Sequence, residues 1–64
     1  MLVATTVREA IKMLEAAGWV CVRTKGGHLQ FRKPGNPLVV TVPGALSKDL
    51  APGTWADIRR KAGL

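Results

Sequence analysis

The chain has 64 residues, which is enough for one small domain. A hydrophobic content of 47% excludes a disordered basic tail, and the apolar runs are far shorter than the roughly 20 residues that a membrane-spanning helix needs. One cysteine excludes an intrachain disulfide, and one cysteine with one histidine is too few for a structural zinc site. We therefore expect a single domain over residues 1–64 in the reducing cytoplasm, without a signal peptide, metal ion or cofactor.

Positive charge is the first indication of function. Ten Lys and Arg against four Asp and Glu give a net charge of +6. On so small a surface this charge attracts polyanions, above all nucleic acid. The alternative is that the charge serves solubility alone.

The first predicted element is a helix from about Val7 to Ala17. Thr6 and Glu9 have the spacing of a capping box, in which a hydroxyl and a carboxylate satisfy free amides at the helix start. Gly18 is a typical helix stop. One helical stripe is apolar and predicts the buried face: Val7, Ala10, Ile11 and Leu14.

Three strands are predicted next, over residues 19–23, 28–33 and 38–42, separated by turns at 24–27 and 34–37. After Pro43, residues 44–52 have no period and indicate a loop. A second helix then begins with Thr54 as N-cap and Asp57 in its first turn. The order predicts an α+β fold, α-β-β-β-α, with a three-stranded antiparallel sheet and both helices on one face.

Four-residue turns set the predicted register: Arg23 opposite His28 in the first hairpin, and Phe31 opposite Val40 in the second. The two hairpins then agree on the faces of the sheet. The predicted core face holds Val20, Val22, Leu29, Phe31, Leu38, Val40 and Val42. The predicted open face holds Trp19, Cys21, Arg23, His28, Gln30, Arg32, Val39 and Thr41. Trp19 with Val39 there favours a partner protein or a homodimer; stacking on a base or on Arg32 is the alternative.

Lys25-Gly26-Gly27-His28 is the motif with the clearest chemistry. Paired glycines allow backbone amides to approach a phosphate, and Lys25 adds a positive charge. Histidine accepts and donates protons near neutral pH, and RNA carries its own nucleophile in the 2′-OH. His28 is therefore the candidate general base. The alternative is a solvated histidine or a phosphate contact.

Further cations on the same strands complete the predicted site. We expect them, with Lys25, to steer and neutralise RNA phosphates, and the two glycines to give backbone access. The predicted RNA-binding residues are Arg23, Lys25, Gly26, Gly27, Arg32 and Lys33. Cys21 has no second histidine to activate it and is interpreted as a small sheet residue.

Several motifs occur in an order that resembles one family, over residues 6–64. They are Ala17-Gly18-Trp19, Lys25-Gly26-Gly27-His28, Val40-Thr41-Val42-Pro43, Leu50-Ala51-Pro52-Gly53-Thr54 and Lys61-Ala62-Gly63-Leu64. This pattern resembles the HicA toxins, mRNA interferases of type II toxin–antitoxin pairs. The resemblance implies a double-stranded-RNA-binding-domain-like fold and metal-independent mRNA cleavage with His28 as the catalytic histidine. It also implies a HicB antitoxin that covers the active site.

Two positions depart from the family pattern. Many members have Ser and a second polar residue around the histidine, where this chain has Gly27 and Leu29; many have a histidine after the Val-Pro step, where it has Gly44. Two other functions stay open: a non-catalytic double-stranded-RNA-binding module, and a degenerate toxin that only binds its antitoxin.

Overall fold

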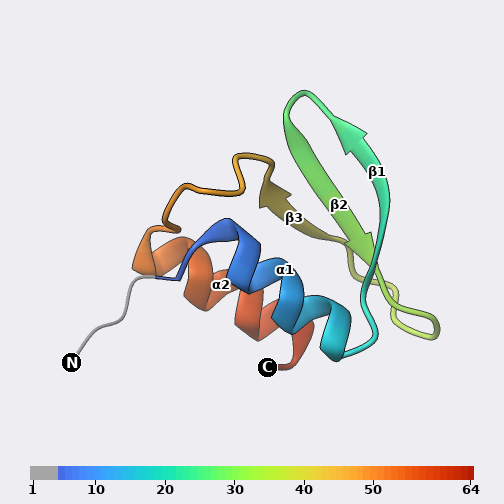
Figure 1. Ribbon diagram of the computed structural model, residues 1–64. Helices are drawn as coiled ribbons and strands as arrows, with labels where there is room; N and C mark the ends of the chain where they lie inside the picture. Colours follow the sequence, from blue (N-terminus) through green and yellow to red (C-terminus); the bar gives the residue numbers. More distant parts are fainter. Residues whose placement is uncertain (1–4) are drawn as a thin grey trace.

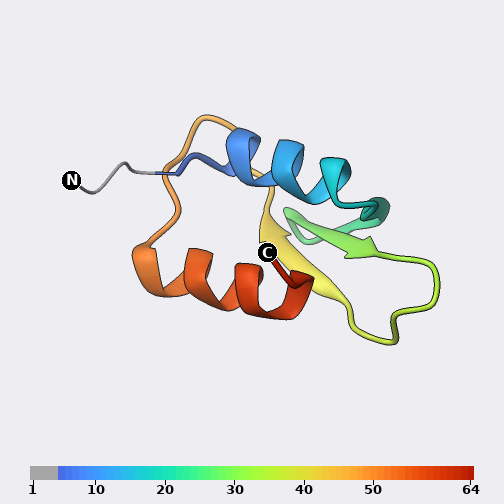
Figure 2. The same ribbon diagram turned by 90° about the horizontal axis from the view of Figure 1, so that it is seen from below.

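The computed structural model describes residues 5–64 and has the predicted order of elements (Figure 1). Three antiparallel strands form one sheet in the order β1-β2-β3. Both helices lie on the same side of this sheet, which leaves its other side open (Figures 1 and 2). The predicted α+β fold is thereby confirmed. The elements are α1 (Val7–Ala16), β1 (Val20–Lys25), β2 (His28–Arg32), β3 (Val40–Pro43) and α2 (Pro52–Ala62).

Helix α1 begins with the predicted capping box. The Glu9 amide donates to Thr6 Oγ1 at 3.2 Å, and the Thr6 amide donates to the Glu9 carboxylate at 3.3 Å. These bonds satisfy two donors that have no partner within the helix. The apolar stripe then packs inward, with Val7, Ala10 and Leu14 buried.

The core lies between the helices and one face of the sheet. Trp19 belongs to it: its side chain is 1% exposed, and its indole Nε1 donates to the Ala62 carbonyl of α2 at 3.3 Å. The prediction that Trp19 lies on the open face was therefore wrong. The buried residues are Val7, Ala10, Leu14, Trp19, Phe31, Val40, Val42, Leu50, Ile58 and Ala62.

The first hairpin is tighter than predicted. Lys25, not Arg23, faces His28, so the turn has two residues, Gly26 and Gly27. Both have positive φ, +58° and +77°, as a type I′ turn requires. Two adjacent glycines adopt this turn without steric cost, and β1 therefore continues to Lys25.

A β-bulge then changes which residues of β1 face the open side. Cys21 faces Phe31 and Arg23 faces Gln30, so Val22 is an extra residue between two pairs. The predicted core residues Val20 and Val22 are 56% and 57% exposed.

The predicted position of Cys21 on the open face was also wrong. Since Cys21 faces Phe31, it lies on the helix side of the backbone. It is nevertheless exposed, because β1 is an edge strand.

The second hairpin has the predicted register, with Phe31 opposite Val40 and Leu29 opposite Val42. Strand β3 begins at Val40 rather than at Leu38, and Leu38 is 46% exposed, not buried as predicted. The reason is the turn after β2, which ends with the Leu38 amide donating to the Asn36 side chain instead of to a strand.

Helix α2 begins earlier than predicted. Its N-cap is Ala51 and Pro52 takes the first position, where the missing amide of proline costs nothing. Thr54 is therefore not the cap, and Asp57 is not in the first turn. Ile58 and Ala62 are buried as predicted, and Trp55 is half-buried against the core.

The loop between β3 and α2 is fastened to the start of α1. The Val7 amide donates to the Lys48 carbonyl at 2.9 Å, and the Arg8 amide donates to the Leu46 carbonyl at 3.1 Å. In the other direction, the Leu50 amide donates to the Thr5 carbonyl at 2.7 Å. The loop thus satisfies free amides of α1 that its own capping box leaves without a partner.

Candidate nucleic-acid interface

The Gly26-Gly27 turn places Lys25 and His28 side by side. They face each other across the hairpin, so their side chains leave the same face of the sheet with Cβ atoms about 5 Å apart. This face is the open one, because Phe31 and Leu29, which alternate with His28 along β2, point to the core side. The structure thus brings the predicted base and a predicted phosphate ligand together.

His28 is oriented by its own turn. Its ring Nδ1 lies 3.1 Å from the Gly26 carbonyl oxygen, and the side chain is exposed. A carbonyl oxygen only accepts, so this hydrogen bond requires the proton on Nδ1. In the neutral ring Nε2 then carries the lone pair, which is the arrangement of a proton acceptor.

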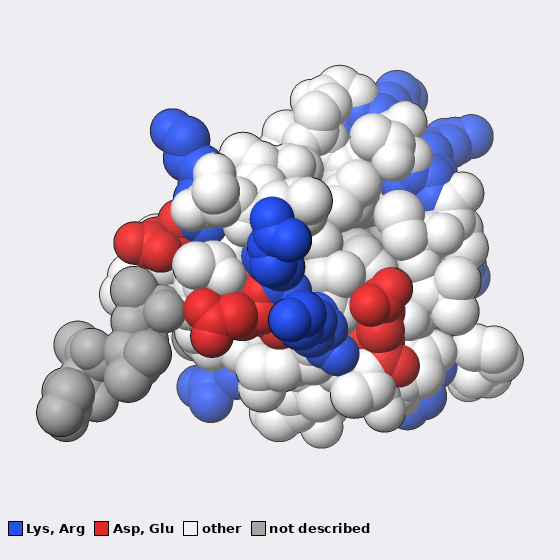
Figure 3. Space-filling view, viewed as in Figure 1, with Lys and Arg blue, Asp and Glu red and all other residues white. Residues whose placement is uncertain are grey.

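The cations of this interface have no acidic neighbour in the sequence around them. No Asp or Glu occurs between residues 16 and 48, whereas Arg23, Lys25 and Arg32 do. Figure 3 shows the result on one side of the molecule: acidic and basic side chains lie close together over the helices, and only basic ones lie over β1 at the upper right.

The cations at the end of α2 differ in this respect. Arg60 and Lys61 lie 3.5 and 3.4 Å from the Asp57 carboxylate, and Arg59 stacks over Trp55 at 5.8 Å from the ring centroid. Both ion pairs found within residues 5–64 involve Asp57. Neither these ion pairs nor this stacking contact involves Arg23, Lys25 or Arg32.

The predicted RNA-binding residues divide into two groups along β2. Arg23, Lys25 and the two glycines lie near His28, whereas Arg32 is four residues further on, about 13 Å away at the rise of a strand. Lys33 is half-buried, and its side chain crosses Gly18, since a Cβ added there would lie 3.4 Å from Lys33 Cε. These two cations therefore cannot share one phosphate with His28.

Gly44 is a residue of the site that sequence reasoning missed. Its amide donates to the Gly27 carbonyl at 2.7 Å, so it fastens the turn that carries His28. A Cβ on residue 44 would lie 2.6 Å from the same oxygen, too close for any side chain. The only signal in the sequence was the absence of a side chain directly after the Val42-Pro43 step.

Metal-binding clusters and membrane-spanning helices are both absent from the described residues. Within residues 5–64, no three His, Cys, Asp or Glu side chains come together as a metal site would require. Across the same residues, no helix has the length and apolar character needed to cross a bilayer.

The fold and this interface define a small basic α+β domain that carries an exposed histidine, His28, beside Lys25 on the open face of its sheet. Residues 7–64 match the family model of the HicA toxin of bacterial toxin–antitoxin systems, and the chain belongs to this family. Membership makes it a toxin of a toxin–antitoxin pair and, in general terms, an endoribonuclease that acts on RNA and has a HicB antitoxin as partner. The comparison with curated proteins found no match.

Proposed function

We propose that this HicA toxin cleaves mRNA without a metal ion and uses His28 as its general base. The observation that carries the proposal is the hydrogen bond between His28 Nδ1 and the Gly26 carbonyl, which leaves Nε2 free on the open, cationic face. The net charge of +6 supports a nucleic-acid substrate, and the free Cys21 fits the reducing cytoplasm as the compartment of action.

The chemistry needs one base and one nucleophile. His28 Nε2 takes the proton of a ribose 2′-OH, and the 2′ oxygen forms a bond to the adjacent phosphorus. The bond from phosphorus to the 5′ oxygen breaks, and the departing oxygen takes a proton from water. The products are a 2′,3′-cyclic phosphate and a 5′-OH end, and a single general base accelerates such a step by about 10²–10⁴-fold.

The cations near His28 stabilise the charge that develops on the phosphate. Lys25 faces His28 directly, and Arg23 follows on the same face, where each adds positive potential at the reacting group. The exposed Gly26-Gly27 backbone lets the phosphate approach closely. Arg32 and Lys33 act further along the RNA.

An antitoxin can inhibit such a site by covering it. His28 and Lys25 are exposed on one face, so a HicB antitoxin that covers this face blocks both. The single domain expected over residues 1–64 and the homodimer stay predictions; the family match over residues 7–64 favours the first of these.

The test compares wild type with His28→Ala on a long, mostly unstructured RNA in excess EDTA, with new 5′ ends mapped. We expect cleavage by wild type only, with 5′-OH ends. The matched control is Lys12→Ala on α1, an exposed residue outside the interface, which should cleave normally.

Two results contradict the proposal. Cleavage by a folded His28→Ala protein shows that His28 is not the base, and loss of cleavage by wild type in EDTA shows that a metal ion is required. Binding of RNA that stays intact with both proteins favours the non-catalytic binding module.

A further inference from the structure

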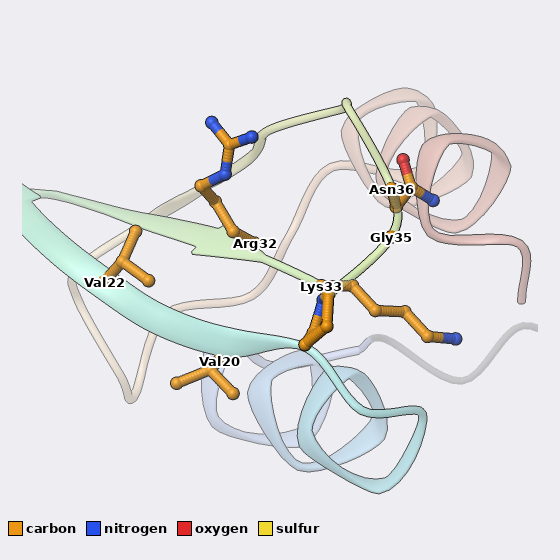
Figure 4. A pocket seen from close by; sticks show the side chains of 7 residues that line it. Val20, Val22, Arg32, Lys33, Gly35 and Asn36 are labelled. Carbon is orange, nitrogen blue, oxygen red and sulfur yellow. The ribbon is translucent and has the colours of Figure 1, made fainter.

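A shallow pocket lies on the open face at the end of the sheet opposite to His28 (Figure 4). Its volume is about 380 Å³. Val20 and Val22 come from β1, Arg32 from β2, and the remaining wall from the turn that follows (Figure 4). The lining residues that carry the argument are Val20, Val22, Arg32, Lys33, Gly35 and Asn36.

The wall of the pocket is preformed. The Asn36 amide donates to the Lys33 carbonyl at 3.0 Å, which closes a four-residue turn with Pro34 and Gly35 at its centre. Gly35 has a φ of +80°, and Pro34 fixes its own φ, as in a type II turn. A ligand therefore meets a wall that does not have to be ordered on binding.

The side-chain nitrogen atoms of the residues that line the pocket are hydrogen-bond donors. Arg32 and Lys33 have no acceptor atoms, and the side-chain oxygen of Asn36 already accepts from the Leu38 amide at 2.9 Å. The Asn36 NH₂ group is what remains for a ligand. The complementary ligand presents acceptor oxygens towards this rim and an apolar surface towards Val20 and Val22, which are more than half exposed.

A nucleotide has both properties, since its phosphate and base carbonyls are acceptors and its base and sugar have apolar faces. A carboxylate side chain of a protein shares the acceptor oxygens. The continuity of the surface decides between them: His28, Gln30 and Arg32 alternate along β2 and so share the open face. An RNA strand cut at His28 crosses about 13 Å of cationic surface and reaches the pocket.

We propose that this pocket holds one nucleotide of the substrate RNA that is separated from the cleaved bond along the strand, and so acts as a subsite remote from the histidine. The inference rests on the proposed function, because it assigns the RNA to the same face. It makes the length of RNA beyond the cleaved bond a determinant of affinity. It also gives the exposed Val20 and Val22 a role in RNA binding, although the sequence predicts both as core residues.

The experiment measures binding without cleavage. Fluorescently labelled oligouridylates of stepwise increasing length are titrated into the His28→Ala protein, and affinity is read from anisotropy. We expect affinity to rise by about tenfold in one step, at the length that spans from residue 28 to the pocket, because one nucleotide then gains apolar contact with the two valines and a charge-assisted hydrogen bond to Arg32. The step should disappear when Val22→Asp or Arg32→Gln is added to His28→Ala.

The matched control is Val39→Asp in the same background. Val39 is exposed and outside the pocket, so the same change of charge should keep the step. A step that survives both Val22→Asp and Arg32→Gln overturns the inference, as does a smooth rise of affinity with length in the parent protein. If Val22→Asp leaves RNA binding unchanged and instead prevents neutralisation by an antitoxin, the pocket serves a protein.

Failure of the proposed function gives a different result. It appears as RNA cleavage by the His28→Ala protein or as intact RNA with wild type, and neither outcome changes the length dependence of binding. Circular dichroism of each variant shows whether the fold is retained.

Discussion

The two faces of the sheet have opposite roles. The helix-covered face supplies Phe31, Val40 and Val42 to the core, and the open face carries Lys25 and His28. Acidic side chains occur only in the helices and the loop between β3 and α2, so the two faces also differ in charge. The residues that stabilise the fold and the residues proposed for RNA cleavage are therefore different, although they alternate along the same strands.

Removal of a core side chain should have the largest effect and should test the stability half of this comparison. Trp19→Ala deletes a buried indole and its hydrogen bond to Ala62, and we expect a loss of about 3–5 kcal/mol in the free energy of unfolding. Urea denaturation followed by circular dichroism measures this loss. Val22→Ala, on the open face, is the control and should cost at most about 1 kcal/mol. Equal losses in the two variants would show that the faces do not differ in this way.

Gly44→Ala should have the next largest effect, on activity. The added methyl group meets the Gly27 carbonyl and displaces the turn that carries His28. A misplacement of this kind costs on the order of 10²-fold in kcat/KM. Nitrogen-15 NMR of the His28 ring reports independently whether the hydrogen bond to Gly26 is kept.

Gly53→Ala is the matched control for that change. A Cβ on residue 53 meets nothing within 4 Å, so this variant should keep full activity and the same ring spectrum. If the Gly44→Ala protein is active and its His28 spectrum is unchanged, Gly44 does not position the turn that carries His28.

Charge reversal tests whether RNA binds to the open face rather than to the helices. Lys25→Glu lies beside His28 and should weaken RNA binding by about tenfold and lower the slope of log affinity against log salt by about 1. Titrations at several salt concentrations measure both effects. Lys12→Glu makes the same change of charge on α1, and its salt slope should stay closer to that of wild type. Equal slopes in the two variants would place RNA on the helices as well.

The smallest effect is expected at the start of α1. Thr6→Ala removes the capping hydroxyl that accepts from Glu9, and we expect a loss of about 1 kcal/mol in the free energy of unfolding. RNA cleavage, measured well below the unfolding transition, should not change. A lower kcat in this variant would show that the start of α1 affects cleavage at the open face.

The family match bears on the chemistry more than the fold does. The α-β-β-β-α order alone does not distinguish an RNA-binding module from an RNA-cleaving toxin, because function depends on the side chains of the site. Membership in the HicA family supports a toxin and an endoribonuclease in general terms. The proposed role of His28 rests on its geometry in the turn.

The sequence by itself determined the local features of this protein. The spacing of Thr6 and Glu9 predicts the capping box, because both partners lie within one turn of helix. The alternation of Leu29 and Phe31 predicts the second strand and its faces, and the four-residue turn at 34–37 predicts the register of the second hairpin. The motif at residues 25–28 predicts a glycine turn directly before His28, although the sequence predicts Arg23 opposite His28, where the structure places Lys25.

Only the tertiary structure decided which face of β1 meets water. A two-residue turn and a bulge at Val22 together reassign Val20 and Val22 to the open side, and neither changes the alternation that the sequence displays. Trp19 is packed in the core between the helices and the sheet, where its indole donates to the Ala62 carbonyl of α2, and Gly44 lies against Gly27 of the first hairpin. These contacts join segments far apart in the chain, so no local pattern encodes them, and they depend on how helices and strands pack.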